Sequence, residues 1–322
     1  MEIKNWNGVK VLITGADGFI GSHLTEHLIN LGAKVSIFVK ENSASGSKFT
    51  PLNLQNSIKK ISNIVTGDIS SEDCIKLIKD TEPEVIFHLA AEAYVPKSFT
   101  QPLLVKKVNL DGTLNVLNAA MDLDIKRIVC TSSSEIYGNS EIAINEDHPL
   151  NPTSPYGASK AAADRFCFAY YKTYNLPISI IRPFNTYGPR HTYDVIPKFI
   201  SLALKNDPLT IYGAGEQTRD FTYVDDTVNG FLLMGSRKEA IGQAVNFGAG
   251  NDISINNIAK KIIEYSKSKS QIVHIEPRKA EVQKLLCDPS KAKMLFSWEA
   301  KISIDEGLKR NIKWEMVNTL NR

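Results

Sequence analysis

The chain has 322 residues, of which 43% are hydrophobic and 23% are charged, a composition that is ordinary for a globular protein and argues against disorder. The formal net charge of +3 gives no support for nucleic-acid binding, which requires a concentrated basic face, so we expect no nucleic-acid partner. No apolar run reaches the roughly 18–20 residues of a membrane span, and the four widely spaced cysteines match neither a zinc pattern nor a disulfide framework. We therefore expect a cytoplasmic protein without a transmembrane segment or a bound metal.

Short β-branched runs alternate with amphipathic helical stretches through the first two thirds of the chain. The predicted strands span residues 9–14, 34–39, 64–65, 85–89, 127–132 and 178–182, and the predicted helices span 22–31, 72–79, 109–121 and 156–174. Nearly continuous apolar strands that alternate with helices are typical of a parallel sheet covered on both faces. The predicted fold class is α/β, with a doubly wound parallel sheet of the Rossmann type.

The pattern changes after Pro183, where loops lengthen, Gly and Pro cluster, and helices and strands become shorter. We predict a dinucleotide-binding Rossmann domain over residues 1–183, to which residues from about 222 to 248 return. The remainder of 184–322 is predicted to form a smaller C-terminal α/β domain that binds the substrate.

Three glycines with the spacing G-x-x-G-x-x-G follow the first predicted strand and open the first predicted helix. Without side chains they let the backbone turn sharply and approach a pyrophosphate, whose charge suits a helix N-terminus. Because a strand and a helix flank the trio, we predict a dinucleotide site here. Its residues are Gly15, Asp17, Gly18, Phe19, Ile20 and Gly21.

The end of the second predicted strand bears on which dinucleotide binds. NAD sites carry a carboxylate at this position, which holds the ribose 2′-hydroxyl. This chain has Val39 followed by Lys40, and Lys40, Asn42 and Ser43 could instead hold a 2′-phosphate. The sequence favours NADP slightly over NAD, and NAD stays open if Lys40 is merely solvated.

Further cofactor contacts are expected where the third and fourth predicted strands end. Asp68 could cap the next helix or accept a hydrogen bond from the adenine amino group. The other residues expected here are Ile69, Leu89, Ala90 and Ala91.

A phenol and an ammonium group, those of Tyr156 and Lys160, stand four residues apart on a predicted helix and so share one face. A nearby cation favours phenolate and lowers the tyrosine pKa toward the range useful for a general base. Ser133, Ser134 and Glu135 follow the fifth predicted strand, whose carboxyl end should face the ligand crevice of a parallel sheet. These two polar clusters predict the catalytic site.

Together these motifs resemble the extended short-chain dehydrogenase/reductase superfamily, in its NAD-dependent epimerase/dehydratase group. The resemblance covers nearly the whole chain. It rests on the glycine trio, on the Ser133, Tyr156 and Lys160 triad, and on residues 88–91, 182–190 and 219–226. It implies a nucleotide-sugar substrate and a cofactor that stays tightly bound and is regenerated in each turnover.

Within this group, Ser133-Ser134-Glu135 is similar to the Thr-Asp-Glu or Thr-Ser-Glu of nucleotide-sugar 4,6-dehydratases, whereas epimerases carry small residues after the hydroxyl. The chain most resembles the legionaminic-acid type of dehydratase, which acts on nucleotide-linked N-acetylglucosamine. That resemblance rests on residues 16–21, 148–150, 181–187, 281–282 and 287–293. We therefore expect UDP-N-acetylglucosamine, or another nucleotide-linked N-acetylglucosamine, to be converted to the 4-keto-6-deoxy sugar.

The resemblance also implies a role for each catalytic side chain. Tyr156, assisted by Ser133, would take the proton of the sugar 4-hydroxyl, and Lys160 would hold the ribose. Glu135 would remove the C5 proton before the 6-hydroxyl leaves as water. Ser134 stands where related enzymes have an aspartic acid, so the group that protonates the leaving hydroxyl stays open between Glu135 and a water held by Ser134.

Polar residues of the C-terminal part would bind the other end of the substrate, where guanidinium groups suit a diphosphate. The expected residues are Asn185, Arg190, Arg219 and Arg278. His88 and His191 are expected to be satisfied by neighbours, and Asp225 with Asp226 to cap a helix. The resemblance also implies a homodimer that pairs through the helix carrying Phe166, Phe168, Tyr170 and Tyr171, although ordinary core packing explains much of this aromatic content too.

Two alternatives to the dehydratase are kept open. A nucleotide-sugar epimerase of the same superfamily would use Tyr156 and Lys160 in the same way but would have no use for Glu135. A non-catalytic dinucleotide sensor would keep the fold without turnover, although such proteins usually lose the tyrosine or the lysine.

Overall fold

The computed structural model describes residues 2–40, 52–277 and 282–319, and the chain forms two compact units. Unit 1 comprises Met1–Ile136, Ser154–Arg182 and Val228–Val245, and unit 2 comprises Tyr137–Thr153, Pro183–Thr227 and Asn246–Arg322. Among the described residues, no helix has the length and apolar character that crossing a membrane demands.

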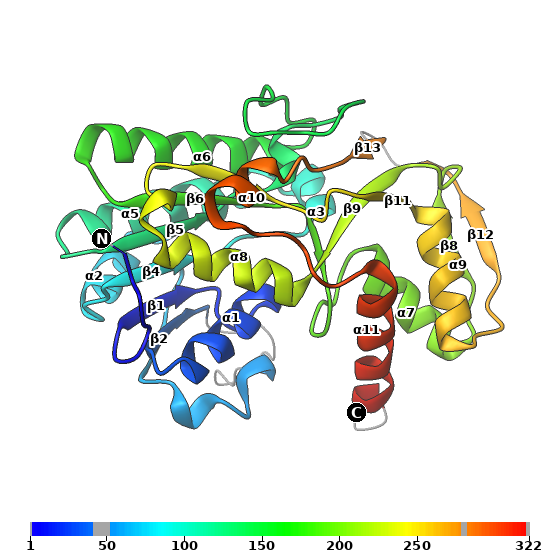
Figure 1. The fold of residues 1–322 in the computed structure, drawn as a ribbon, viewed down its shortest axis with the longest axis horizontal. Coiled ribbons are helices and arrows are strands. Elements are labelled where there is room, and N and C mark those ends of the chain that lie inside the picture. The colour runs from blue at the N-terminus through cyan, green and yellow to red at the C-terminus, as the bar shows by residue number, and fades with distance from the viewer. Residues whose placement is uncertain (1, 41–51, 278–281, 320–322) are drawn as a thin grey trace. The chain divides into compact units, whose positions relative to one another are not determined.

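A seven-stranded sheet of order β10-β6-β5-β4-β1-β2-β3 forms the centre of unit 1 (Figure 1). Its strands are β1 (Lys10–Thr14), β2 (Lys34–Val39), β3 (Asn63–Thr66), β4 (Val85–His88), β5 (Arg127–Thr131), β6 (Ile178–Pro183) and β10 (Ala244–Phe247). The pairs β1–β2, β2–β3, β1–β4, β4–β5 and β5–β6 are parallel. The order 3-2-1-4-5-6 is that of a Rossmann sheet, so the predicted fold class is confirmed. The seventh strand, β10, was not predicted.

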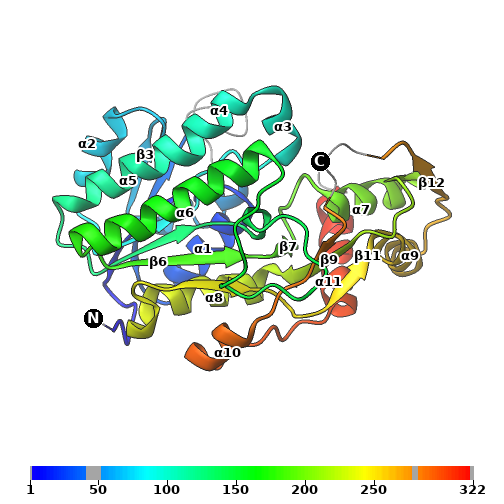
Figure 2. The ribbon, with the colours of Figure 1, turned by 90° about the horizontal axis from the view of Figure 1, so that it is seen from above.

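Helices cover both faces of this sheet (Figure 2). Helices α1 (Phe19–Asn30) and α8 (Val224–Ser236) lie on one face, and α2 (Asp73–Lys79), α5 (Gly112–Met121) and α6 (Pro155–Tyr174) lie on the other. Alternate strand residues such as Leu12, Ile86 and Ile128 are fully buried in the core beneath α2, α5 and α6. Each such side chain contributes roughly 1.5–3 kcal/mol by leaving water, so the strand interiors stabilise the sheet and leave the strand ends available for a site.

The helix predicted over residues 109–121 begins earlier and is irregular. Helix α3 (Val95–Thr100) is followed by α4 (Pro102–Lys106), a π-helical turn (Lys107–Asp111) and then α5. π-Helical turns are rare and occur frequently at functional sites. The remaining short helical turns of the chain are Leu52–Leu54, Ile58–Lys60, Ser134–Ile136 and Lys238–Ala240.

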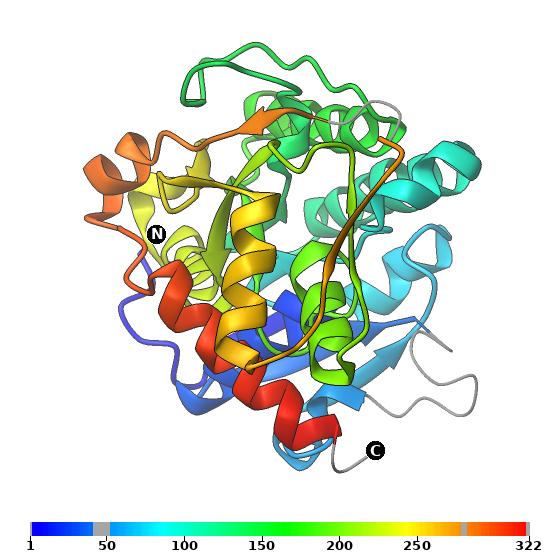
Figure 3. The same cartoon turned by 90° about the vertical axis from the view of Figure 1, so that its right-hand side faces the viewer.

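Unit 2 is built from small sheets and helices (Figure 3). One sheet contains β7 (Asn185–Tyr187), β9 (Thr218–Tyr223), β11 (Asp252–Ser254) and β13 (Lys284–Leu285), and β8 (Leu209–Tyr212) pairs in parallel with β12 (Ile272–Ile275). The helices are α7 (Val195–Lys205), α9 (Ile255–Ser266), α10 (Ser290–Phe296) and α11 (Ile304–Thr319). Helix α9 packs against both α7 and α11, and the apolar residues of these amphipathic helices form the core of the unit.

Candidate active site

The glycine turn between β1 and α1 brings two backbone segments into contact. Gly15 has a φ of +70°, and a Cβ there would lie 2.8 Å from the backbone nitrogen of Ala90. A Cβ on Gly21 would lie 2.2 Å from the carbonyl oxygen of Gly15. Gly18 stands at the N-cap of α1, and its N–H donates to the Gly15 carbonyl at 3.1 Å. Only glycine fits at positions 15 and 21. The N-terminus of α1 faces this turn.

Asp17, which the sequence predicts to contact the cofactor, forms two hydrogen bonds with Asn53. Its Oδ1 accepts a hydrogen bond from the Asn53 N–H at 3.2 Å, and its carbonyl accepts one from Asn53 Nδ2 at 2.7 Å. The next two predicted residues, Phe19 and Ile20, are half-buried in the first turn of α1. Asp17 therefore ties the glycine turn to the segment that follows β2.

Lys40 and Asp68 lie together at the ends of β2 and β3. The Lys40 ammonium is 3.1 Å from the Asp68 carboxylate, which also accepts hydrogen bonds from Ser70 N at 2.9 Å and Ser70 Oγ at 2.7 Å. Burial alone would raise the pKa of Asp68, but these hydrogen bonds and the Lys40 charge hold it below its usual value. Glu72, not Asp68, is the N-cap of α2, so the predicted helix cap is wrong: Asp68 caps the turn before the helix.

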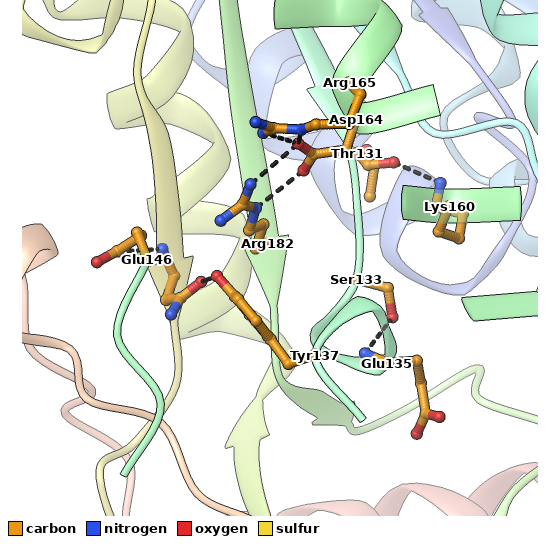
Figure 4. Close-up of polar contacts among 10 residues, drawn as sticks. Thr131, Ser133, Glu135, Tyr137, Glu146, Lys160, Asp164, Arg165 and Arg182 are labelled. Carbon is orange, nitrogen blue, oxygen red and sulfur yellow. Dashed lines mark hydrogen bonds and ion pairs between the residues drawn. The ribbon is translucent and has the colours of Figure 1, made fainter. Parts of the chain in front are cut away.

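The predicted catalytic residues follow β5 and open α6. Ser133, Ser134, Tyr156 and Lys160 are buried and Glu135 is half-buried, all within unit 1. The Ser133 hydroxyl accepts a hydrogen bond from the Glu135 N–H at 3.2 Å. Figure 4 shows the Glu135 carboxylate directed away from the Lys160 ammonium, so the two groups do not contact each other.

Lys160 donates a hydrogen bond to the carbonyl oxygen of Thr131, the last residue of β5 (Figure 4). Burial lowers the pKa of Lys160 to about 8. The ammonium is thus held at the carboxyl end of a central strand, one helical turn from Tyr156 on the same face of α6.

The start of α6 is fixed by side chains that the sequence analysis did not single out. The Ser154 hydroxyl caps the helix by accepting from Gly157 N at 3.0 Å. The Ser159 hydroxyl donates to the Tyr156 carbonyl at 2.7 Å and accepts from Asn109 Nδ2 at 3.0 Å. Asn109 lies in the π-helical turn, so this irregular turn contacts the helix that carries Tyr156. Asn109 lies in a stretch that also holds Lys107 and Asp111, so its polarity alone gave no signal for this contact.

A buried ion pair joins α6 to β6. The Asp164 carboxylate accepts hydrogen bonds from Arg182 Nε at 2.8 Å and Nη2 at 2.9 Å, and it also pairs with Arg165 (Figure 4). Burial alone would raise the pKa of Asp164, but Arg182 holds it below its usual value. This pair was not predicted, because nothing local in the sequence connects residues 18 positions apart.

In unit 2, the predicted substrate residues lie on or near β7 and β9. Asn185 is half-buried, and within the described part of the chain its buried Oδ1 has no hydrogen-bond partner, which leaves an acceptor for a ligand. Arg219 Nη1 donates to the carbonyl of its neighbour Thr218 at 2.8 Å. Arg190 is half-buried and has a φ of +71°, a conformation that non-glycine residues rarely adopt.

Three other predicted residues, Asn42, Ser43 and Arg278, lie outside the described residues. In the ranges that the structure does describe, no three or more His, Cys, Asp or Glu side chains are arranged to hold a metal ion. Asp226 is structural but does not cap α8: its carboxylate accepts the backbone N–H groups of Lys301 at 3.0 Å and Ile302 at 2.9 Å.

Comparisons with known proteins identify related families and structures. A family model described as GDP-mannose 4,6 dehydratase matches residues 12–311. The chain is 36% identical over 313 residues to a UDP-glucuronate 4-epimerase of Thermodesulfobacterium geofontis, which covers 95% of this chain and 96% of that protein. It is 32% identical over 328 residues to the dTDP-D-glucose 4,6-dehydratase of Mus musculus, covering 97% and 90%.

A solved structure is similar along nearly the whole chain. It is DesIV, a dTDP-glucose 4,6-dehydratase from Streptomyces venezuelae with NAD and TYD bound. The TM-score is 0.87 at 28% identity, and the match covers 96% of this chain and 97% of that one.

Proposed function

The chain belongs to the GDP-mannose 4,6-dehydratase family within the NAD-dependent epimerase/dehydratase group of short-chain dehydrogenases/reductases, and from that premise we propose that it is itself a nucleotide-sugar 4,6-dehydratase. Overall identity does not separate this activity from epimerisation, since the epimerase and the dehydratase named above are similarly close. One observation carries the proposal: a half-buried carboxylate, Glu135, follows directly after the buried hydroxyls of Ser133 and Ser134. An epimerase needs no base at this position.

The residues of unit 1 support a dinucleotide cofactor. The close approach of Gly15 to Ala90, which a Cβ would block, and the N-terminus of α1 fit a pyrophosphate. A dinucleotide held there would supply a reversible hydride acceptor for the sugar.

The side chains supply the proton transfers. Tyr156, as phenolate, takes the proton of the 4-hydroxyl with help from Ser133, and the buried Lys160 ammonium stabilises the phenolate. The resulting 4-ketone acidifies the C5 hydrogen. Glu135 removes this proton and then donates it to the 6-hydroxyl, which leaves as water. Carboxylates and phenolates placed in this way contribute roughly 10²–10⁴ each in rate.

We propose NAD as the cofactor, which revises the slight preference of the sequence for NADP. A 2′-phosphate held by Lys40 would also meet the Asp68 carboxylate, 3.1 Å from the ammonium, and the two anions would repel each other. NAD is bound in the Streptomyces enzyme. Titration with both dinucleotides tests this: tighter binding of NADP would restore the first preference.

The substrate we propose is a nucleotide-linked N-acetylglucosamine, with UDP-N-acetylglucosamine first among the candidates. The arginines of unit 2 would donate to its diphosphate, and Asn185 Oδ1 would accept from a hydroxyl or N–H group of the substrate. We also propose a homodimer through α6. Of the four aromatic residues named for that interface, Phe166 and Phe168 are 42% and 40% exposed, whereas Tyr170 and Tyr171 pack against the core.

A product assay tests the activity. The protein is incubated with UDP-N-acetylglucosamine, UDP-glucose, dTDP-glucose and GDP-mannose, and product mass is followed. Loss of one water supports dehydration. Unchanged mass with altered stereochemistry would instead establish the epimerase, and dinucleotide binding without turnover would establish the sensor.

The role of Glu135 is tested by Glu135→Gln. We expect release of water to slow by about 10²–10⁴ while C4 oxidation persists, seen as reduced cofactor. Glu141→Gln, at an exposed position a few residues further on, is the matched control and should leave both steps unchanged. Water release at the native rate in Glu135→Gln would exclude Glu135 as the base.

A further inference from the structure

A buried chain of hydrogen bonds surrounds His88 where β1 and β4 end. Thr14 and His88 are directly paired across these parallel strands, and both side chains are buried, as is that of Thr113 on α5. The distances are 2.8 Å from Thr14 Oγ1 to His88 Nδ1 and 3.0 Å from His88 Nε2 to Thr113 Oγ1. The chain ends at two backbone groups, the N–H of Ala90 and the carbonyl of Asn109.

The direction of every bond follows from these two ends. The Asn109 carbonyl can only accept, so the Thr113 hydroxyl, 2.6 Å away, donates its proton to it. The Thr113 oxygen must then accept from His88. Nε2 of His88 therefore carries the proton and Nδ1 does not. Nδ1 accepts from the Thr14 hydroxyl, whose oxygen in turn accepts the Ala90 N–H at 3.1 Å. Every donor in this hydrogen-bond chain therefore has an acceptor.

This chain of hydrogen bonds contacts the backbone that the proposed cofactor would approach. Ala90 is the residue whose nitrogen lies against Gly15, and Thr14 directly precedes Gly15. Strands β1 and β4 are also the neighbours between which the strand order of the sheet reverses, the place where ligands bind in such folds. A substitution of His88 would therefore alter the contact between the glycine turn and the end of β4.

We propose that His88 is a positioning residue for the dinucleotide: as a neutral imidazole protonated on Nε2, it holds Thr14 so that Gly15 and Ala90 keep the spacing that a pyrophosphate requires. The inference rests on the dinucleotide site proposed above. Burial lowers the pKa of His88 to about 3, with the Lys160 charge acting in the same direction, so the imidazole stays uncharged at neutral pH.

The tautomer can be observed directly and without any ligand. A long-range ¹H–¹⁵N spectrum of the native protein, with the His88 signals assigned by their loss in His88→Gln, should show a protonated Nε2 and an unprotonated Nδ1 at neutral pH. An Nδ1-protonated ring, or an imidazolium, would overturn the proposed direction of the chain.

The functional consequence is tested by Thr14→Val, which keeps the side-chain shape but removes the hydroxyl. Because the Ala90 N–H then loses its acceptor, binding of NAD should weaken by about tenfold, while binding of UDP stays unchanged. Thr14→Ser should restore NAD binding, which a purely steric effect of the strand end would not explain.

Thr25→Val on α1 is the matched control. Thr25 is fully buried, yet in the described structure its hydroxyl has no hydrogen-bond partner, so NAD binding should not change. Native affinity for NAD in Thr14→Val would refute the proposal. A native protein that bound neither NAD nor NADP would contradict the proposed function itself, whereas the spectrum would still decide the tautomer.

Discussion

Replacing Asp164 with Asn should lower the free energy of unfolding by about 3–5 kcal/mol, because a buried guanidinium then loses its counter-charge. The side chains of Asp164 and Arg182 are 0% and 3% exposed, and two hydrogen bonds of 2.8 and 2.9 Å join them. Asparagine has nearly the same shape, so the cost is electrostatic rather than that of a cavity. Urea denaturation followed by circular dichroism measures it.

Arg165 provides the internal comparison, because it pairs with the same carboxylate but is 50% exposed. Arg165→Met should cost no more than about 1 kcal/mol, since exposed pairs contribute little. The double variant Asp164→Leu with Arg182→Met, which removes both charges, should be less destabilised than Asp164→Asn. If Asp164→Asn and Arg165→Met cost the same within about 1 kcal/mol, the reasoning from burial is wrong.

The same pair predicts a pH dependence of stability. Because the pKa of Asp164 is lower in the folded state, the carboxylate stabilises the fold above its unfolded pKa of about 4, and this stabilisation is lost as the pH falls below it. The difference between native protein and Asp164→Asn should therefore shrink in acid. A difference that stays constant from pH 7 to pH 3 would contradict this assignment.

Three further predictions concern the cofactor, the catalytic lysine and the dimer. Gly15→Ala places a methyl group 2.8 Å from Ala90 N at a φ of +70°, so NAD affinity measured by calorimetry should fall at least about tenfold, and an unchanged affinity would argue against this cradle. Because burial lowers the pKa of Lys160 to about 8, kcat/KM should fall as the pH rises through that value. In Lys160→Arg this fall should occur at a higher pH. A fall at the same pH would assign it to another group. Phe166→Ser with Phe168→Ser should yield monomers in sedimentation, whereas the paired leucine substitutions should not; dimers in both would exclude this face.

The sequence predicted the parts of the fold whose signals are local. Strands such as β2 matched residue for residue, because a run of β-branched and apolar residues decides a buried strand. The four-residue strand β10 was missed, because its place beside β6 depends on residues that are distant in the sequence. The π-helical turn before α5 was likewise missed, because periodicity predicts a regular helix there.

The candidate site divides in the same way. Gly15 was predicted because a turn leaves a pattern in adjacent residues, and the structure gives it a positive φ and a close backbone neighbour. The contacts of His88 could not be predicted, since its two hydroxyl partners lie 74 and 25 residues away. Asp17 shows the converse: a residue inside a recognisable motif bonds to Asn53, which the motif does not include.

The division between strand interiors and strand ends has a consequence for how such a protein changes over evolutionary time. Leu12, Ile86 and Ile128 maintain the architecture, while the proposed chemistry belongs to a few side chains just past Thr131 and in the first two turns of α6. Substitutions at those few positions can therefore alter the reaction while the core residues stay the same. A scaffold of this kind is evolvable, and its activity is best inferred from two or three positions rather than from overall resemblance.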